Sequence, residues 1–206
     1  MLKRGFDIAV SGLALLLLWP LILFMAILVR LDSPGPSFFL QIRIGRNFRR
    51  FRLWKLRSMT NGNSGAEITS GQEARITRIG GFLRRFKFDE LPQLWNVFCG
   101  DMSFVGPRPE VATFVEQFRS DYEEILRVRP GITDPASIRY RHEAELLGAA
   151  PDPVKHYTGV ILPDKIKISK EYLRSRNFRK DMAIIIQTIT AIFRRDKPIS
   201  PSPSML

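Results

Sequence analysis

Hydrophobic residues are spread very unevenly along the chain, and the longest apolar run lies at its N-terminus. From Ile8 to Val29 no side chain is charged, and about 20 apolar residues suffice to span a bilayer. The run ends at Arg30-Leu31-Asp32, without the small-residue cleavage site that follows the apolar core of a signal peptide. We therefore interpret residues 1–33 as a membrane element.

Two features of this run argue against a simple span. Pro20 follows Trp19 in its middle, where proline removes a backbone hydrogen bond and bends a helix. Lys3 and Arg4 precede the run and several arginines follow it, so the positive-inside rule keeps both flanks cytoplasmic. A helix broken at Pro20 that enters and leaves by the same face satisfies both constraints. A straight span with a proline kink is the alternative that these residues leave open.

Two strands with alternating apolar and polar residues follow, at 37–45 and 51–59. A turn from Gly45 to Asn47 separates them, so we expect the two strands to pair. Such a ribbon could present Lys55 and Arg57 to a phosphate. A solvated basic face, or one lying on anionic lipid, is the competing interpretation.

Apolar spacing predicts helices in the rest of the chain. A short basic helix is expected at 76–85, and an amphipathic helix from Glu110 to Val128. Another helix opens at Pro163, and the apolar stretch from Met182 to Phe193 is too short to span a membrane. We expect this last helix to lie in the membrane interface or to pack on the core.

The resulting fold class is α+β, mainly helical, with a small β ribbon and interfacial helices. We expect residues 1–33 to form the re-entrant membrane hairpin and residues 34–206 to form a second domain seated on the membrane surface. A polar loop is expected at 61–65 and a mobile, proline- and serine-rich tail at 197–206.

Charge and composition limit the classes of partner and of cysteine chemistry that this chain can have. The net charge of +12 indicates a partner rich in negative charge, such as nucleic acid, anionic lipid or a phosphorylated substrate. The single cysteine, Cys99, excludes an internal disulfide and a cysteine-based zinc cluster. It follows an apolar run, so we expect it to be a small buried residue.

The chain's most reactive pattern is the pair of carboxylates at Asp89 and Glu90. Basic residues precede the pair, and Pro92 is tolerated only in the first turn of a helix. We therefore expect a helix to open at Asp89 or Glu90, where the helix N-terminus attracts phosphate. An ionised Asp there is a candidate nucleophile toward phosphorus, whereas an Asp N-cap is the commoner explanation of the dipeptide alone.

A second candidate lies in Gly106-Pro107-Arg108-Pro109. Prolines on both sides hold the backbone around Arg108 stiff and extended. An arginine held in this way is pre-organised to bind a phosphate with two hydrogen bonds. An ordinary loop arginine is the alternative.

Taken together, these motifs resemble the bacterial sugar transferase family, the monotopic phosphoglycosyl transferases that start glycan assembly on a polyprenol carrier. The resemblance covers nearly the whole chain, and DELPQLWNV followed by GDMSFVGPRP is its most specific part. The other motifs are KRxFD (Lys3, Arg4, Phe6, Asp7), the turn Pro34 to Pro36, KxRSM (Lys55, Arg57, Ser58, Met59), RPGIT (Arg129 to Thr133) and LPDKIKIxxEYL.

The resemblance implies an enzyme of the bacterial inner membrane that acts on phosphosugars, with residues 34–206 as a catalytic domain at the cytoplasmic face. Asp89 would attack the β-phosphate of a nucleotide diphosphate sugar, usually a UDP-sugar, and release UMP. Polyprenol phosphate would then take the sugar phosphate from the covalent aspartyl intermediate. Lipid is an expected partner, and nucleic acid is not.

The resemblance also assigns the other site residues. Glu90 would be a base or would orient a metal, and Mg²⁺ would bridge Asp89 and the diphosphate, with Asp89 and Glu90 as its protein ligands. The candidates for holding phosphates are Lys55, Arg57, Arg84, Arg108 and Arg129.

Two departures from the family pattern and one competing function remain. Trp19-Pro20 stands where relatives usually have Ser-Pro, and Asp134 follows Gly131-Ile132-Thr133 where many relatives have Gly, which leaves the sugar open. A basic adaptor that binds nucleic acid or anionic membrane would explain the charge of +12. It would not explain DELPQLW or the proline-flanked Arg108.

Overall fold

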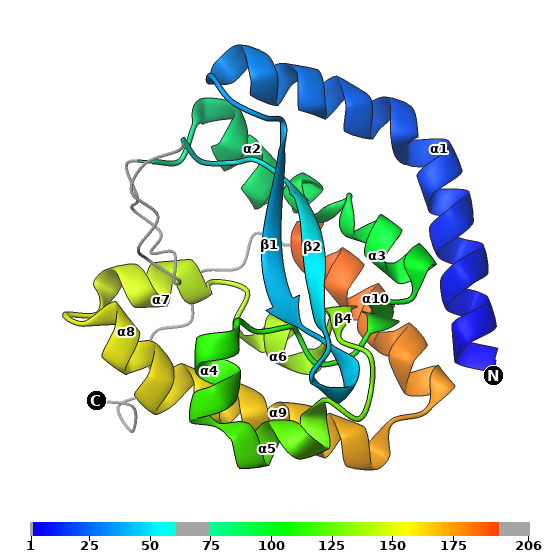
Figure 1. Ribbon diagram of the computed structural model, residues 1–206, viewed down its shortest axis with the longest axis vertical. Coiled ribbons are helices and arrows are strands. Elements are labelled where there is room, and N and C mark those ends of the chain that lie inside the picture. The colour runs from blue at the N-terminus through cyan, green and yellow to red at the C-terminus, as the bar shows by residue number, and fades with distance from the viewer. Residues whose placement is uncertain (1, 61–74, 194–206) are drawn as a thin grey trace.

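The part of the chain that the structure describes is mainly helical and carries two small sheets (Figure 1). This computed structural model describes residues 2–60 and 75–193, so the predicted loop at 61–65 and tail at 197–206 lie outside the described residues. The α-helices are α1 (Leu2–Asp32), α2 (Arg78–Arg85), α3 (Gln93–Cys99), α4 (Ala112–Gln117), α5 (Arg119–Ile125), α6 (Pro135–Arg139), α7 (Glu143–Ala149), α8 (Pro153–His156), α9 (Leu162–Ser175) and α10 (Phe178–Phe193). Short 3₁₀ turns lie at η1 (Arg46–Phe48) and η2 (Phe88–Glu90), and a π-helical turn, η3 (Tyr157–Ile161), joins α8 to α9. The strands are β1 (Phe38–Ile44), β2 (Arg50–Leu56), β3 (Ser103–Val105) and β4 (Gly131–Thr133).

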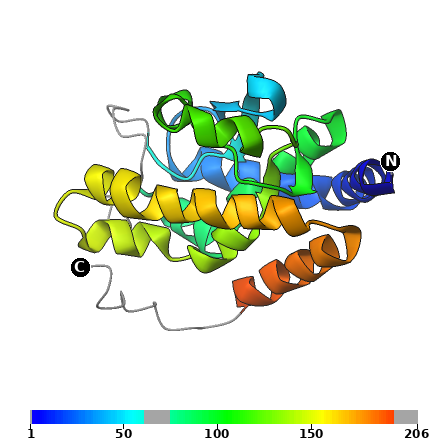
Figure 2. The ribbon, with the colours of Figure 1, turned by 90° about the horizontal axis from the view of Figure 1, so that it is seen from below.

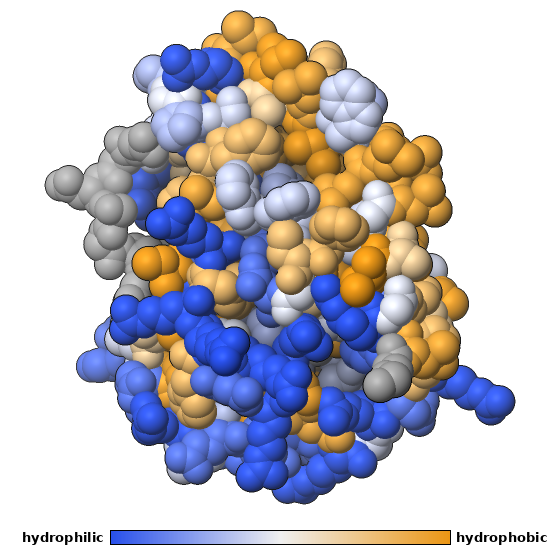
Figure 3. Space-filling model, turned by 45° about the vertical axis from the view of Figure 1, so that its right-hand side comes forward, coloured by the Kyte–Doolittle hydropathy of each residue, from blue (hydrophilic) through white to orange (hydrophobic). Residues whose placement is uncertain are grey.

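The N-terminal apolar run forms one helix, α1, that continues through Pro20. The ribbon changes direction partway along it (Figure 1), as expected where a proline lacks the N–H of a helical hydrogen bond. This helix is long and apolar enough to cross a membrane, and 17% of its most apolar window is buried. Its hydrophobic side chains form an exposed band along one edge of the molecule (Figure 3). That exposure indicates a membrane-associated protein.

The N-terminal end of α1 is fixed to the body of the protein by its charged residues. Lys3 Nζ donates to the carbonyl of Val105 at 2.8 Å. The Arg4 guanidinium donates to the carbonyls of Val97 and Phe98 at 2.7 and 2.9 Å. These carbonyls belong to the C-terminal end of α3, where a cation is favoured by the helix dipole.

The other end of α1 is fixed just as firmly. Arg57, directly after β2, is buried and donates to the carbonyls of Ser33 and Pro34 at 2.6 and 2.8 Å. Asp32 accepts a hydrogen bond from the backbone N–H of Ile79 at 3.0 Å and so helps to cap α2. The end of α1, the end of β2 and the start of α2 therefore meet.

Strands β1 and β2 pair antiparallel, from Phe38 opposite Leu56 to Ile44 opposite Arg50, which confirms the predicted ribbon. The parallel pair of β3 and β4 was not predicted, because the sequence of each indicated only a loop or a turn. These two backbones approach closely: a Cβ on Gly131 would lie 2.2 Å from the Gly106 nitrogen. Only glycine fits there.

The prediction of one continuous helix from Glu110 to Val128 is wrong, because this segment forms two helices. The chain forms α4 and α5, separated at Phe118, whose φ of −114° and ψ of 37° are not helical. The predicted apolar stripe is nevertheless buried, as Phe114, Tyr122 and Ile125 show. Both halves of the stripe still enter one core: the Phe114 and Tyr157 ring centroids are 5.0 Å apart, and α5 packs against α9.

The largest hydrophobic core lies where α4 and α5 pack against η3 and α9. Seen from below, α9 crosses the middle of the molecule, with α4 and α5 on one side and α10 on the other (Figure 2). Ile184 of α10 is buried, whereas Ile186 and Ile189 are exposed, so this helix both packs on the core and leaves an apolar face free. Cys99 is exposed, contrary to the prediction of a buried residue.

Candidate active site

Asp89 lies in the short turn between α2 and α3. Lys87 adopts a left-handed conformation with φ of 59°, which ends α2 and turns the chain into the 3₁₀ turn η2. The helix was expected to open at Asp89 or Glu90, but α3 begins only at Gln93, with Pro92 before it. The two carboxylates therefore precede the helix instead of occupying its first turn.

The Asp89 carboxyl group is buried, and its Oδ1 accepts no hydrogen bond from any residue that the structure describes. Burial raises the pKa of Asp89, and the Glu90 carboxylate raises it further. Three cations, Lys55, Lys87 and Arg84, oppose this rise. An unpaired buried carboxylate among cations is costly to maintain, and such groups are found at functional sites.

Glu90, in contrast, is fully occupied by ion pairs. Arg108 contacts its carboxylate through both terminal nitrogens, and the NH1–Oε2 distance is 3.4 Å. Lys55 Nζ lies 3.5 Å from Oε1. Burial alone would raise the pKa of Glu90, but Arg108 and then Lys55 lower it well below its ordinary value. A carboxylate with so low a pKa is a poor general base at neutral pH.

The cations of this pair come from distant parts of the chain. Lys55 stands near the end of β2, and Arg108 follows β3 after Gly106 and Pro107. The close contact of β3 with β4 fixes where Arg108 leaves the sheet, and Arg108 NH1 also lies 3.5 Å from the Ile132 carbonyl of β4. The stiff Pro107-Arg108-Pro109 backbone thus presents its guanidinium at the carboxylates.

We call the residues around Asp89 and Glu90 the carboxylate cluster. Of the five predicted phosphate-binding residues, the structure brings Lys55, Arg84 and Arg108 to this cluster. Arg57 instead donates to main-chain carbonyls at the end of α1. Arg129 Nε donates to the Gly100 carbonyl at 2.7 Å, at the far end of α3 from Asp89. Both arginines therefore hold the framework of the site and lie outside the cluster.

Sequence reasoning missed two residues that build the site. The buried Asn96 donates to the Arg52 carbonyl at 2.8 Å and accepts from the Trp54 N–H at 3.1 Å, which docks α3 on β2. Glu110 joins β1 to η3 by accepting from Tyr157 at 2.8 Å and pairing with Arg43 at 3.2 Å. The signal in the sequence that could have identified them is a polar side chain next to apolar residues, since a buried polar group needs hydrogen-bond partners.

The Asp89 carboxylate is the one side chain described at this site that could bind a divalent cation without first breaking an ion pair. Among the described residues, no three His, Cys, Asp or Glu side chains converge on one point. The unpaired Oδ1 of Asp89 suits Mg²⁺, which commonly takes one or two carboxylates and completes its shell with water and substrate phosphate. Glu90 fits less well, because Arg108 and Lys55 already neutralise it.

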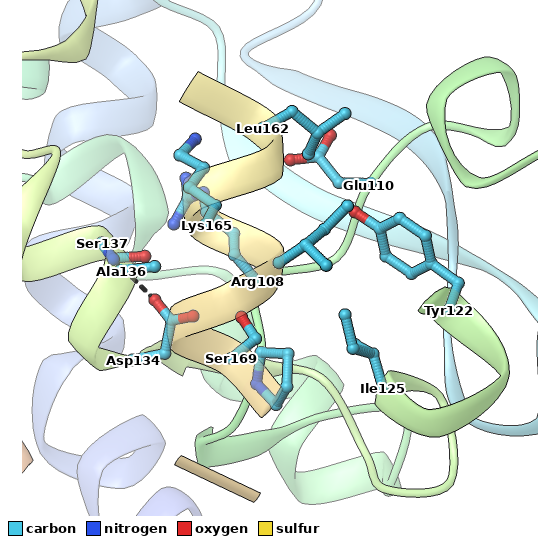
Figure 4. A pocket seen from close by; sticks show the side chains of 12 residues that line it. Arg108, Glu110, Tyr122, Ile125, Asp134, Ala136, Ser137, Leu162, Lys165 and Ser169 are labelled. Atoms are coloured by element: carbon cyan, nitrogen blue, oxygen red, sulfur yellow. Dashed lines mark hydrogen bonds between the residues drawn. The ribbon is translucent and has the colours of Figure 1, made fainter. Parts of the chain in front are cut away.

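A small cavity beside Arg108 is lined by Asp134, which caps α6, by Ser137 of α6 and by Lys165 of α9 (Figure 4). Its volume of about 20 Å³ suits one water molecule and excludes a nucleotide. Asp134 accepts from the Ser137 N–H at 2.7 Å, and burial raises the pKa of this carboxyl. This cavity is therefore too small to be the binding site of a nucleotide.

Comparison with known proteins identifies the family of this chain. The family model described as bacterial sugar transferase matches residues 1–195. This chain belongs to that family. A protein of Aeromonas hydrophila, named UDP-N-acetylgalactosamine-undecaprenyl-phosphate N-acetylgalactosaminephosphotransferase, is 39% identical over 200 residues, 93% of this chain and 43% of the relative. The exopolysaccharide production protein PSS of Rhizobium leguminosarum bv. phaseoli is 38% identical over 205 residues, 95% of this chain and 97% of the relative.

A third relative of this sugar transferase comes from Escherichia coli (strain K12) and is named UDP-glucose:undecaprenyl-phosphate glucose-1-phosphate transferase. It is 35% identical over 195 residues, 92% of this chain and 39% of the relative. The chain thus spans less than half the length of the Aeromonas and Escherichia proteins. It covers almost all of the Rhizobium protein.

Proposed function

We propose that this sugar transferase moves a sugar 1-phosphate from a UDP-sugar to polyprenyl phosphate and releases UMP, as the initiating step of bacterial glycan assembly. The observation that carries this proposal is the buried, unpaired Asp89 carboxylate among Lys55, Arg84 and Lys87. The names of the Aeromonas and Escherichia relatives support both the UDP-sugar donor and the undecaprenyl phosphate acceptor. They differ in the sugar, so the sugar must be found by a screen.

The reaction proceeds in two displacements at one phosphorus atom. A carboxylate oxygen of Asp89 attacks the β-phosphorus of the UDP-sugar and forms an acyl phosphate that carries the sugar. The bond between this phosphorus and the bridging oxygen breaks, and UMP leaves with the electron pair. A phosphate oxygen of the polyprenyl phosphate then attacks the same phosphorus, which releases Asp89 and gives a polyprenyl diphosphate sugar.

Charge neutralisation supplies most of the catalysis, since phosphoryl transfer depends on positioning and electrostatics. In this proposal Arg108 and Lys55 hold the diphosphate, and their ion pairs with Glu90 orient them before substrate binds. Glu90 need not accept a proton, because the attacking phosphate oxygen is already ionised. Mg²⁺ bound by Asp89 would neutralise charge on the diphosphate.

We also propose that α1 is re-entrant and seats the enzyme on the cytoplasmic face of the inner membrane. A straight helix of 31 residues would be about 46 Å long, so a membrane would separate its two ends. Yet Lys3 near one end and Ser33 just past the other both bond to the same folded body. The change of direction of α1 in Figure 1 supports the proposal that both of its ends lie on one side.

The test of the chemistry is the covalent adduct. Purified protein is incubated with a panel of UDP-sugars, and UMP release and a gain in protein mass are both measured. We expect Asp89→Asn to abolish the adduct, and the exposed Glu116→Gln to leave it unchanged as the matched carboxylate-to-amide control. An undiminished adduct in Asp89→Asn would overturn the assignment.

A further inference from the structure

Three phenylalanine rings contact one another directly before Asp89, and we call this group (Phe82, Phe86 and Phe88) the aromatic ledge. The ring centroids of Phe82 and Phe86 are 5.0 Å apart, and Phe88 lies 6.0 and 5.9 Å from these two rings. Phe82 is 45% exposed. Aromatic rings that serve only the core are buried more completely, so this exposed group indicates a binding surface.

The ledge is packed against the membrane helix. Phe88 contacts the same buried cluster as Leu21 and Leu28 of α1, and this cluster includes Met25 and Leu83. The exposed ring of Phe82 is thus held close to a helix whose outward side chains are apolar and exposed. A ligand on the Phe82 ring could keep its apolar part in contact with protein or lipid while its other end reaches toward the Asp89 carboxylate.

Cations lie at the end of the ledge nearest Asp89. The Arg85 guanidinium lies 5.5 Å from the centre of the Phe86 ring, and Arg84 and Lys87 flank the turn that carries Asp89. The surface thus combines an apolar strip with a positive head. Its chemical complement is a long apolar chain that ends in a phosphate.

We propose that the aromatic ledge binds the phosphate-proximal isoprene units of polyprenyl phosphate and so aligns the acceptor with Asp89. This inference rests on the proposed function, and it assigns Phe82 a role in acceptor binding alone. The UDP-sugar step needs no contact with the ledge. Phospholipid of the surrounding bilayer is the competing occupant.

The experiment separates the two half-reactions in liposomes of fixed composition. The first is the burst of UMP release without acceptor, and the second is transfer to long and short polyprenyl phosphates. For Phe82→Ala we expect an unchanged burst and an about tenfold lower kcat/KM for the long acceptor. Phe82→Leu should recover most of this loss, and the preference for the long over the short acceptor should shrink in Phe82→Ala.

The matched control is Phe98→Ala, which removes a ring that is 40% exposed on α3 and away from the ledge. An equal loss in this control would assign the effect to membrane seating and overturn the proposal. An unchanged kcat/KM in Phe82→Ala would do so too, as would recovery of the loss by added phospholipid. A wild-type protein without any UMP burst would instead refute the proposed function.

Discussion

At Asp89 the chain buries a carboxylate whose Oδ1 no described residue satisfies. Its pKa in the folded state is raised, by burial first and by Glu90 second. At pH 7 this carboxylate is ionised in the unfolded chain, so holding it buried costs stability, and the cost disappears below its unfolded pKa of about 4. The residue that we propose as the nucleophile therefore destabilises the fold.

We predict that Asp89→Asn is more stable than the wild-type protein while lacking the adduct. The expected gain is about 1 kcal/mol at pH 7, or roughly 2–4 °C in Tm. Thermal unfolding in detergent between pH 7 and pH 3 measures it, and the two curves should converge as the pH falls. A variant less stable at pH 7 would show that Asp89 has a stabilising partner.

Glu90 has the opposite character, because its carboxylate neutralises two cations. We predict that Glu90→Gln destabilises the protein by about 2 kcal/mol, less than for a fully buried pair because 33% of the Arg108 side chain is exposed. Added UDP should raise the Tm of this variant more than that of the wild type, since phosphate replaces the lost carboxylate. An equal rise in Tm for the variant and the wild type would mean that the diphosphate does not bind at Arg108 and Lys55.

The sequence could identify the reactive pair but not the full site around it. Asp89 and Glu90 are adjacent, so their motif is visible, whereas Lys55 and Arg108 lie 35 and 18 residues from Glu90. Only the paired strands bring them together. Residue type likewise marked Arg57 as a phosphate ligand, although burial and main-chain carbonyls decide its role in the structure.

Among the elements, those with strong local patterns were predictable. The apolar run became α1, and alternation at 37–45 and 51–59 became the β1–β2 ribbon. Strands β3 and β4 have three residues each, too few for alternation to be seen, and they pair only through a long connection. The break between α4 and α5 is a tertiary effect, since the apolar spacing continues through Phe118.

The β3–β4 pair can be tested at Gly131, where the strands leave no room for a Cβ. We predict that Gly131→Ala destabilises the protein by about 3 kcal/mol, because the added carbon would lie 2.2 Å from the Gly106 nitrogen. Activity should fall as well, since the shift moves Arg108. Gly5→Ala in α1, which meets nothing within 4 Å, is the control and should be neutral or slightly stabilising. Similar Tm values for both variants would contradict this account.

At the scale of the whole molecule, the two ends of α1 and the turn that carries Asp89 form one connected framework. Arg57 and Asp32 join the end of α1 to β2 and α2, and α2 leads directly to Asp89. The Arg4 guanidinium holds the opposite end of α1 to α3, which follows Asp89. The position of α1 therefore sets the position of the proposed nucleophile, which would lie at the membrane surface if α1 is re-entrant as we propose.

This framework predicts that residues before and after α1 lie on the same side of the membrane. Single cysteines replace Leu2, which is 72% exposed, or Leu40, which is 42% exposed, in a Cys99→Ser background, because the native cysteine is itself accessible. In intact spheroplasts both cysteines should be shielded from an impermeant maleimide, and both should react once the membrane is permeabilised.

A third variant, Trp19→Cys next to Pro20, should react poorly in both states because we expect lipid to surround it. Labelling of one end alone before permeabilisation would mean that α1 crosses the bilayer, and the body that holds both of its ends could not then form.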